Sequence, residues 1–198
     1  MFEFNLLWIP GILFAYLIGN LSPATLLSKA KGVDIRKEGS GNPGTTNVLR
    51  TLGKKSAALT LLIDALKGVL AVLAGKMTGG ETLAMICAIA VLAGHIWPVF
   101  YKFKGGKGIA TGLGVLLAFD WRIGLICLGI AAIGILLTRR VSVGSLLTAV
   151  ALPVVSWLLQ PAFVPYAMAI TIIVIWKHRD NIGRLLDGAE PRVGRKGG

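Results

Sequence analysis

The sequence predicts an all-α polytopic integral membrane protein with about seven transmembrane helices. Of its 198 residues, 55% are hydrophobic and only 15% are charged, and the mean hydropathy is +0.74. A soluble domain carries about 25% charged residues. Apolar stretches long enough to cross a bilayer follow one another along the whole chain. Because these stretches leave no room for a second sizeable domain, residues 1–198 are expected to form a single transmembrane domain.

Seven apolar stretches are expected as helices. The first, 6–27, has neither the basic segment before it nor the cleavage site of a signal peptide, so we expect it to be retained. The others are 56–77, 82–100, 108–119, 123–138, 143–159 and 162–176. The stretch 108–119 rises only about 18 Å as a helix, against a hydrocarbon core of about 30 Å. It can therefore also form one bent or re-entrant element with the stretch after Asp120–Arg122, which would leave five spans.

The basic residues predict the orientation. The loop 29–55 holds seven Lys or Arg, 101–107 holds three, 139–140 two, and the tail from residue 177 six. By the positive-inside rule these connections lie in the cytoplasm, which puts the N-terminus outside and the C-terminus in the cytoplasm. The same rule accounts for the pI near 10.2, so no nucleic-acid partner is expected. Any site is expected to open on the cytoplasmic side, where the polar segments gather.

Residue types that commonly bind metals and cofactors are sparse in this sequence. Cys87 and Cys127 lie inside apolar stretches, no CxxC is present, and His, Cys, Asp and Glu do not cluster along the chain. The sequence therefore predicts no disulfide, no metal and no cofactor.

The first polar segment with a chemical pattern is EGSGNPGTTNVLR, at 38–50. Its glycines and proline disfavour a helix and favour a tight loop in which backbone N–H groups converge. Thr45 or Thr46 is expected to cap a short helix that carries Arg50. A helix N-terminus with a nearby cation binds anions. The candidate phosphate-binding residues are Ser40, Gly41, Asn42, Gly44, Thr46, Asn47 and Arg50.

The second segment is FKGGKG, at 103–108. Two glycines between two lysines, directly before an apolar helix, form a cationic loop at a helix N-terminus. The segment is not a Walker A motif, because Gly108 follows Lys107 where that motif has Ser or Thr. It therefore predicts a site for phosphate without implying a nucleotide, and its candidate residues are Lys104, Gly105, Gly106 and Lys107.

The third segment is KHRDNIGR, at 177–184. His178 and Asn181 would share one face if the preceding helix continued through them. The alternative is a basic flank that stops membrane transfer, with a solvated histidine. Ser142, in the first turn of the stretch after Arg140, adds a hydroxyl at the same cytoplasmic level.

Ionisable residues also lie deep within the apolar stretches. Asp64 and Lys67, three residues apart, are expected to form an ion pair that faces other helices. The pair either serves function or only joins helices, and the second role is favoured. His95 lies near the inner end of its stretch and is either a hydrogen-bonding link between helices or a site residue.

The segments GSGNPGTTNVLR, GHIWPVFYKFKGGKG (94–108) and HRDNIGRLLDGAEPR (178–192) together resemble the bacterial acyl-phosphate:glycerol-3-phosphate acyltransferases, the PlsY family. The likeness covers nearly the whole chain, and Thr45 stands where the family more often has Ala. It implies transfer of a fatty acyl group from acyl phosphate to the 1-hydroxyl of glycerol 3-phosphate. The products are lysophosphatidic acid and phosphate, in the first acylation of phospholipid synthesis. It also implies a multi-pass protein of the bacterial inner membrane with its active site facing the cytoplasm.

This resemblance gives the candidate residues their roles. Lys104, Lys107 and the Gly105 and Gly106 amides would hold the acyl phosphate, and the residues of 40–50 would complete the phosphate pocket. His178 and Asn181 would line the acceptor side, with His178, Lys104, Asn181 and Ser142 as catalytic residues. The base would be His178, His95 or a substrate phosphate oxygen. The HxxxxD pattern of another glycerol-phosphate acyltransferase type is missing, because Phe100 and Gly183 occupy its last position.

Two other classes remain open from the sequence. A small phosphate or organic-anion transporter would use the basic loops and a charged pair in a span. It would not explain the lack of an internal repeat or of an outer polar cluster. A structural membrane subunit would leave the glycine-rich loops unexplained. The oligomeric state is not predicted.

Overall fold

The computed structural model describes residues 5–193, and these fold into helices and connecting loops. The prediction of an all-α protein is thus confirmed over this range. The chain divides into two compact units, Met1–Phe119 and Asp120–Gly198. Each unit is described by itself.

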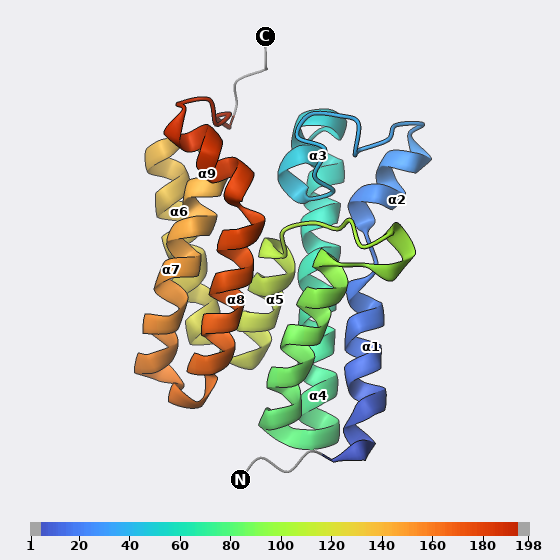
Figure 1. Ribbon diagram of the computed structural model, residues 1–198, viewed down its shortest axis with the longest axis vertical. Coiled ribbons are helices and arrows are strands. Elements are labelled where there is room, and N and C mark those ends of the chain that lie inside the picture. Colours follow the sequence, from blue (N-terminus) through green and yellow to red (C-terminus); the bar gives the residue numbers. More distant parts are fainter. Residues whose placement is uncertain (1–4, 194–198) are drawn as a thin grey trace. The chain divides into compact units, whose positions relative to one another are not determined.

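The first unit contains five α-helices among its described residues, with one short 3-10 turn before the first helix and one before the last (Figure 1). The elements are η1 (Leu6–Trp8), α1 (Ile9–Gly19), α2 (Pro23–Ala30), α3 (Thr45–Leu52), α4 (Lys54–Ile96), η2 (Val99–Tyr101) and α5 (Ile109–Phe119).

The break between α1 and α2 falls inside the stretch 6–27. Pro23 has no N–H to donate into a preceding helical turn. The Ser22 hydroxyl caps α2 by accepting from the Thr25 N–H at 3.4 Å. The span expected over 6–27 is therefore found as Leu6–Ala30, with a break that the sequence analysis did not predict, because Ser22 and Pro23 begin a new helix.

Helix α4 turns back on itself near its middle. A straight helix of its 43 residues would be about 65 Å long, twice the hydrocarbon thickness. Gly79 and Gly80 leave the helical conformation, Gly80 with φ +67°, and Figure 1 shows two legs that run beside each other. Lys67 on the first leg reaches His95 on the second, with 2.8 Å between Nζ and Nδ1. The two legs are the helices predicted over 56–77 and 82–100.

Glycines allow the helices of each unit to approach closely. In the first unit, a Cβ on Gly19 of α1 would overlap a carbonyl of the second α4 leg, and one on Gly114 of α5 would overlap a carbonyl of the first leg. In the second unit, Gly134 and Gly144 bring α6 and α7 together in the same way. Small residues at helix contacts are typical of membrane bundles, where lipid leaves no hydrophobic drive between helices.

The second unit contains α6 (Trp121–Thr138), α7 (Val141–Leu159), η3 (Pro161–Phe163), α8 (Val164–Lys177) and α9 (Arg179–Leu186). Asp120 caps α6 at the predicted turn, because its carboxylate accepts from the Arg122 N–H at 2.9 Å. At the other end of the unit, α8 and α9 meet at an angle of 57° around His178.

Four helices of the described residues are long and apolar enough to cross a membrane, or five if the bent α8–α9 pair is one span. This count takes α4 as one helix although it has two legs, and it leaves out α5, which has 11 residues. An apolar helix or leg is therefore found at each of the seven predicted stretches, while seven crossings remain a prediction.

Candidate active site

The segment 38–50 forms a loop that leads into α3. Gly44 is the N-cap of α3, and no side chain caps it, so the prediction that Thr45 or Thr46 is the cap is wrong. The Gly44 carbonyl accepts from the Asn47 and Val48 N–H groups at 3.0 Å each. The N–H groups of Thr45 and Thr46 come before the first helical hydrogen bond. Thus α3 begins with the electropositive N-terminus that the sequence predicts.

Asn47 supports this loop from inside. It is 1% exposed, and its Oδ1 accepts from the Ser40 N–H at 3.0 Å. Its Nδ2 donates to the carbonyls of Ile35 and Glu38 at 3.2 and 2.9 Å. Because both amide hydrogens are used, Asn47 supports the loop in this structure, and its direct contact with phosphate stays a prediction.

The other predicted residues of this segment lie closer to solvent. Gly41 turns the chain with φ +68° and donates to the Glu38 carbonyl at 2.9 Å. Ser40 is exposed, and Arg50 is exposed in the last turn of α3. The half-buried members are Gly41, Asn42, Gly44 and Thr46.

The glycine loop, defined here as residues 104–107, is joined to the end of α4. The Gly105 N–H donates to the Ile96 carbonyl at 3.1 Å, and the Gly106 N–H donates to the His95 carbonyl at 3.2 Å. These amides are therefore engaged within the protein in this structure, and their contact with the acyl phosphate stays a prediction. The glycines are also needed for packing, because a Cβ at either position would overlap His95. The cationic groups of the loop are Lys104, which is exposed, and Lys107, which is half-buried.

Arg36, two residues before the segment 38–50, joins this part of the chain to the glycine loop. Its guanidinium donates to the Lys104 carbonyl at 3.0 Å and lies over the Tyr101 ring, 5.3 Å from the centroid. The segment 38–50 and the glycine loop therefore lie at the same end of the first unit. Sequence reasoning missed Arg36, since it counted this arginine only as one of seven cations in the loop 29–55.

His178 is the N-cap residue of α9 and is 3% exposed. Helix α8 does not continue straight through His178 but bends into α9. The condition under which His178 and Asn181 were expected to share a face of the preceding helix is therefore not met. Its Nδ1 lies 2.8 Å from the Val174 carbonyl. Because a carbonyl only accepts, Nδ1 carries the proton, and Nε2 is the basic nitrogen of the neutral ring.

Asn181 is held by Glu190. The Asn181 Nδ2 donates to Glu190 Oε1 at 2.7 Å, and the Arg184 Nε donates to Oε2 at 2.8 Å. Arg140, next to α7, donates through Nε to the Glu190 carbonyl at 3.2 Å. Ser142 is buried in the first turn of α7. Within the second unit, the structure thus joins the α8–α9 segment to the start of α7 through residue 190.

The pKa of the Glu190 carboxyl is lowered from its ordinary value of 4.5. Burial alone would raise it, but Asn181, Ser142 and Arg184 stabilise the charged form and outweigh burial. Sequence reasoning missed Glu190. No signal set it apart, because Asp180 and Asp187 also lie among the basic residues of the tail from residue 177.

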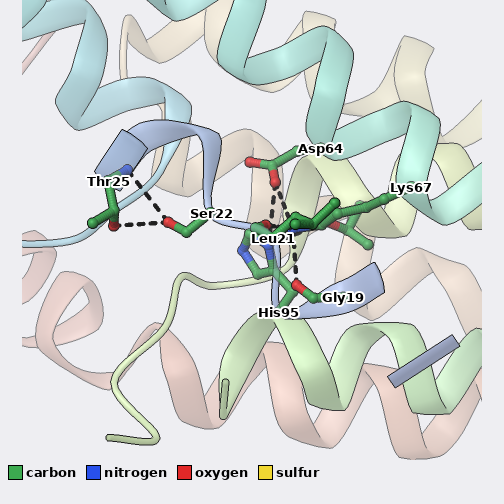
Figure 2. A network of polar contacts seen from close by, with 8 residues as sticks. Gly19, Leu21, Ser22, Thr25, Asp64, Lys67 and His95 are labelled. Carbon is green, nitrogen blue, oxygen red and sulfur yellow. Dashed lines mark hydrogen bonds and ion pairs between the residues drawn. The ribbon is translucent and has the colours of Figure 1, made fainter. Parts of the chain in front are cut away.

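The predicted ion pair of Asp64 and Lys67 is confirmed, with 2.7 Å between Oδ1 and Nζ. Figure 2 shows that it is part of a buried cluster with His95. His95 Nδ1 lies 3.4 Å from the Asp64 oxygen and 2.8 Å from Lys67 Nζ. Lys67 also donates to the carbonyls of Gly19 and Leu21, at 3.2 and 2.7 Å, in the break between α1 and α2. Among residues 5–193, no group of three or more His, Cys, Asp or Glu residues has the arrangement of a metal site.

Comparison with known proteins matches these features to one family. The family model described as glycerol-3-phosphate acyltransferase matches residues 9–188. A glycerol-3-phosphate acyltransferase of Thermoanaerobacter pseudethanolicus (strain ATCC 33223 / 39E) is 48% identical over 188 residues, which cover 93% of this chain and 94% of that protein. One from Synechococcus sp. (strain CC9902) is 45% identical over 186 residues, covering 92% and 93%.

Two solved structures are similar along nearly the whole chain. Both are crystal structures of PlsY, an integral membrane glycerol 3-phosphate acyltransferase, and both are 36% identical to this chain. The glycerol 3-phosphate form has a TM-score of 0.91 and covers 94% of this chain and 96% of that one. The lysophosphatidic acid form has a TM-score of 0.88 and covers 94% of this chain and 95% of that one. Together with the apolar helices, this likeness shows a multi-pass membrane protein, and the chain belongs to the glycerol-3-phosphate acyltransferase family.

Proposed function

We propose that this protein transfers a fatty acyl group from acyl phosphate to the 1-hydroxyl of glycerol 3-phosphate and releases lysophosphatidic acid and phosphate. The observation that carries the donor assignment is the link that Arg36 makes between two cationic, glycine-rich loops at one end of the first unit. Donor and acceptor both carry phosphate, which accounts for the charge gathered there. The similar PlsY structures are described as a glycerol 3-phosphate form and a lysophosphatidic acid form, which names the proposed acceptor and product.

The reaction needs no covalent enzyme intermediate, because acyl phosphate is an activated mixed anhydride. The acceptor hydroxyl oxygen attacks the acyl carbon and forms the new C–O bond. The bond from that carbon to the phosphate oxygen breaks, and its electron pair leaves with phosphate. The hydroxyl proton passes to a base. Positioning and charge stabilisation supply the rest of the catalysis.

In the first unit, Lys104 and Lys107 are assigned to the acyl phosphate and its leaving phosphate. The start of α3 is assigned to phosphate as well, with Arg50 as an added cation. The residues assigned to this loop are Ser40, Gly41, Asn42, Gly44 and Thr46. Asn47, Gly105 and Gly106 hold the loops in place, and their contact with phosphate is part of the same proposal.

In the second unit, His178 and Asn181 are assigned to the acceptor, with Ser142 as an additional catalytic hydroxyl. His178 Nε2 is the candidate base, since Nδ1 donates to Val174. A phosphate oxygen of the substrate is the alternative base. His178→Gln separates the two, because a substrate base leaves kcat within about tenfold of wild type, or about 1.4 kcal/mol of barrier.

The proposal places the protein in the bacterial inner membrane with seven crossings. The basic connections, and therefore the glycine loop and α9, would face the cytoplasm. The N-terminus would lie outside and the C-terminus inside. Single cysteines in the connections near residues 79 and 160, and in the glycine-rich segment near residue 104, test this arrangement with an impermeant thiol reagent on intact cells.

Purified protein tests the activity directly. With acyl phosphate and glycerol 3-phosphate, we expect lysophosphatidic acid and one equivalent of phosphate, whereas acyl-CoA should give no product. Product from acyl-CoA alone would overturn the donor assignment. Absence of product from either donor, together with phosphate flux into vesicles, would favour the transporter alternative.

A further inference from the structure

The buried cluster of Asp64, Lys67 and His95 has no role in the proposed reaction, although it lies inside the apolar helices. The three residues are 1%, 2% and 8% exposed. Ionisable groups within membrane helices are costly to bury and generally serve function. An ion pair that only joins helices would not require a third titratable group in contact with it.

The contacts of Lys67 hold the His95 ring in place. Lys67 Nζ lies against two backbone carbonyls and the Asp64 carboxylate, all of which only accept. It is therefore an ammonium with three hydrogens and no lone pair. Its Nζ also lies 2.8 Å from His95 Nδ1, which in turn lies 3.4 Å from the same Asp64 oxygen and 3.3 Å from Thr111 Oγ1. These contacts at Nδ1 set the orientation of the ring.

The opposite edge of the His95 ring faces the glycine loop. A Cβ on Gly106 would overlap Nε2, and one on Gly105 would overlap the His95 carbonyl. The same carbonyl accepts from the Gly106 N–H at 3.2 Å. The glycine loop therefore rests on both the ring and the backbone of His95, while Lys67 fixes the orientation of that ring from the other side (Figure 2).

We propose that Asp64, Lys67 and His95 are positioning residues that hold the glycine loop, and with it Lys104 and Lys107, in the geometry that binds the substrate phosphate. Lys67 fixes the ring, Asp64 fixes Lys67, and the ring supports Gly106. This inference rests on the proposed binding of phosphate by the glycine loop. None of the three residues contacts substrate in this assignment.

A double-mutant cycle tests the contact between the ring and the loop. Gly106→Ala and His95→Ala should each raise the KM for acyl phosphate about tenfold or more, with a smaller change in kcat. The double variant should be no worse than His95→Ala alone, because the added methyl group then has room. Multiplied effects in the double variant would overturn the proposal.

Two glycines provide matched controls for this cycle. Gly105→Ala overlaps the His95 carbonyl, which remains in His95→Ala, so His95→Ala should not relieve its effect. Gly112→Ala in α5 meets its nearest neighbour at 3.9 Å and should behave as wild type. Relief of Gly105→Ala by His95→Ala would show a general loosening of the loop and would contradict the proposal.

The double variant Asp64→Asn/Lys67→Met tests whether Lys67 positions the glycine loop or only joins helices. This pair removes both charges, so neither is left buried alone. We expect some loss of thermal stability, because the Gly19 and Leu21 carbonyls lose their donor, together with a raised KM for acyl phosphate. A wild-type KM in this variant, at whatever stability, would mean that the pair only joins helices, and would overturn the assignment.

Hydrogen exchange gives a readout that does not depend on activity. The Gly105 and Gly106 N–H groups donate to α4 carbonyls, so without substrate their exchange should be faster in His95→Ala and in the Asp64→Asn/Lys67→Met variant. Unchanged exchange would contradict the positioning role. If exchange rises as expected but wild-type protein makes no lysophosphatidic acid from acyl phosphate, the proposed function fails while the support of the loop stands.

Discussion

Asn181 donates from Nδ2 to Glu190 Oε1 at 2.7 Å, and this bond joins the bent end of the α8–α9 segment to the chain beyond it. The other carboxylate oxygen holds Arg184. One acid thus orients an amide assigned to the acceptor and neutralises a nearby cation. Glu190 therefore connects Asn181 and Arg184 of α9 to the chain beyond that helix.

Glu190→Ala is expected to lower kcat/KM for glycerol 3-phosphate by about tenfold to a hundredfold. It leaves the buried Asn181 amide without its acceptor, which costs about 1–3 kcal/mol. Glu190→Gln keeps an oxygen for Asn181 and should lose less. Steady-state kinetics with acyl phosphate at saturation measures both, and equal losses would mean that the negative charge matters more than the hydrogen bond.

The lowered pKa of Glu190 predicts how stability depends on pH. A carboxyl with a lower pKa in the folded state stabilises the fold above its ordinary value of 4.5, and this contribution disappears as the pH falls through the folded pKa. Wild type should therefore melt above Glu190→Gln near pH 7, and the gap should narrow below pH 4.5. Thermal unfolding in detergent across this range measures it, and a gap independent of pH would contradict the assignment.

Asn47→Asp should damage the first loop more than its small change in shape suggests. The carboxylate still accepts from the Ser40 N–H, but it places negative oxygen against the carbonyls of Ile35 and Glu38. We expect a loss of about 2–3 kcal/mol, with a raised KM for acyl phosphate. Thr51→Ala on the same helix, where the hydroxyl donates only to the Asn47 carbonyl, is the control and should change stability by less.

Lys104→Ala and Arg36→Ala should both weaken binding of acyl phosphate. Lys104 is assigned to the phosphate itself, so its loss should raise KM by about tenfold or more. Arg36 acts through the Lys104 carbonyl and the Tyr101 ring, so Arg36→Lys, which cannot keep both contacts, should resemble Arg36→Ala. A wild-type KM in Lys104→Ala would remove the basis for the phosphate assignment.

The sequence predicted the helices well where composition decides them. The apolar stretches, the turn at Asp120 and the glycines of both loops could be read directly. The break at Ser22–Pro23 also had a signal, a capping serine before a proline. Helix α4 ends at Ile96, just before Trp97 and Pro98, because a residue that precedes proline is disfavoured in a helix.

Contacts set by tertiary structure could not be predicted. The Gly105 and Gly106 amides point back to α4 because the chain folds over residues 97–104, and no local pattern encodes that direction. Arg36 binds Lys104, which lies 68 residues further along the chain. Glu190 binds Asn181, which lies 9 residues before it. From sequence alone, a cation in a basic loop or an acid in a tail could equally well be solvated and make no specific contact.

The contacts of Lys67 also have a consequence for biogenesis. Its ammonium binds carbonyls in the break after α1, a carboxylate on the first leg of α4 and a ring on the second. These groups come together only after the ribosome has made residue 95 and the hairpin has closed. Until then, an inserted first leg carries a charged pair in lipid with incomplete partners. The first leg should therefore leave the translocon together with the second, so that the membrane receives a helical hairpin and not two separate helices.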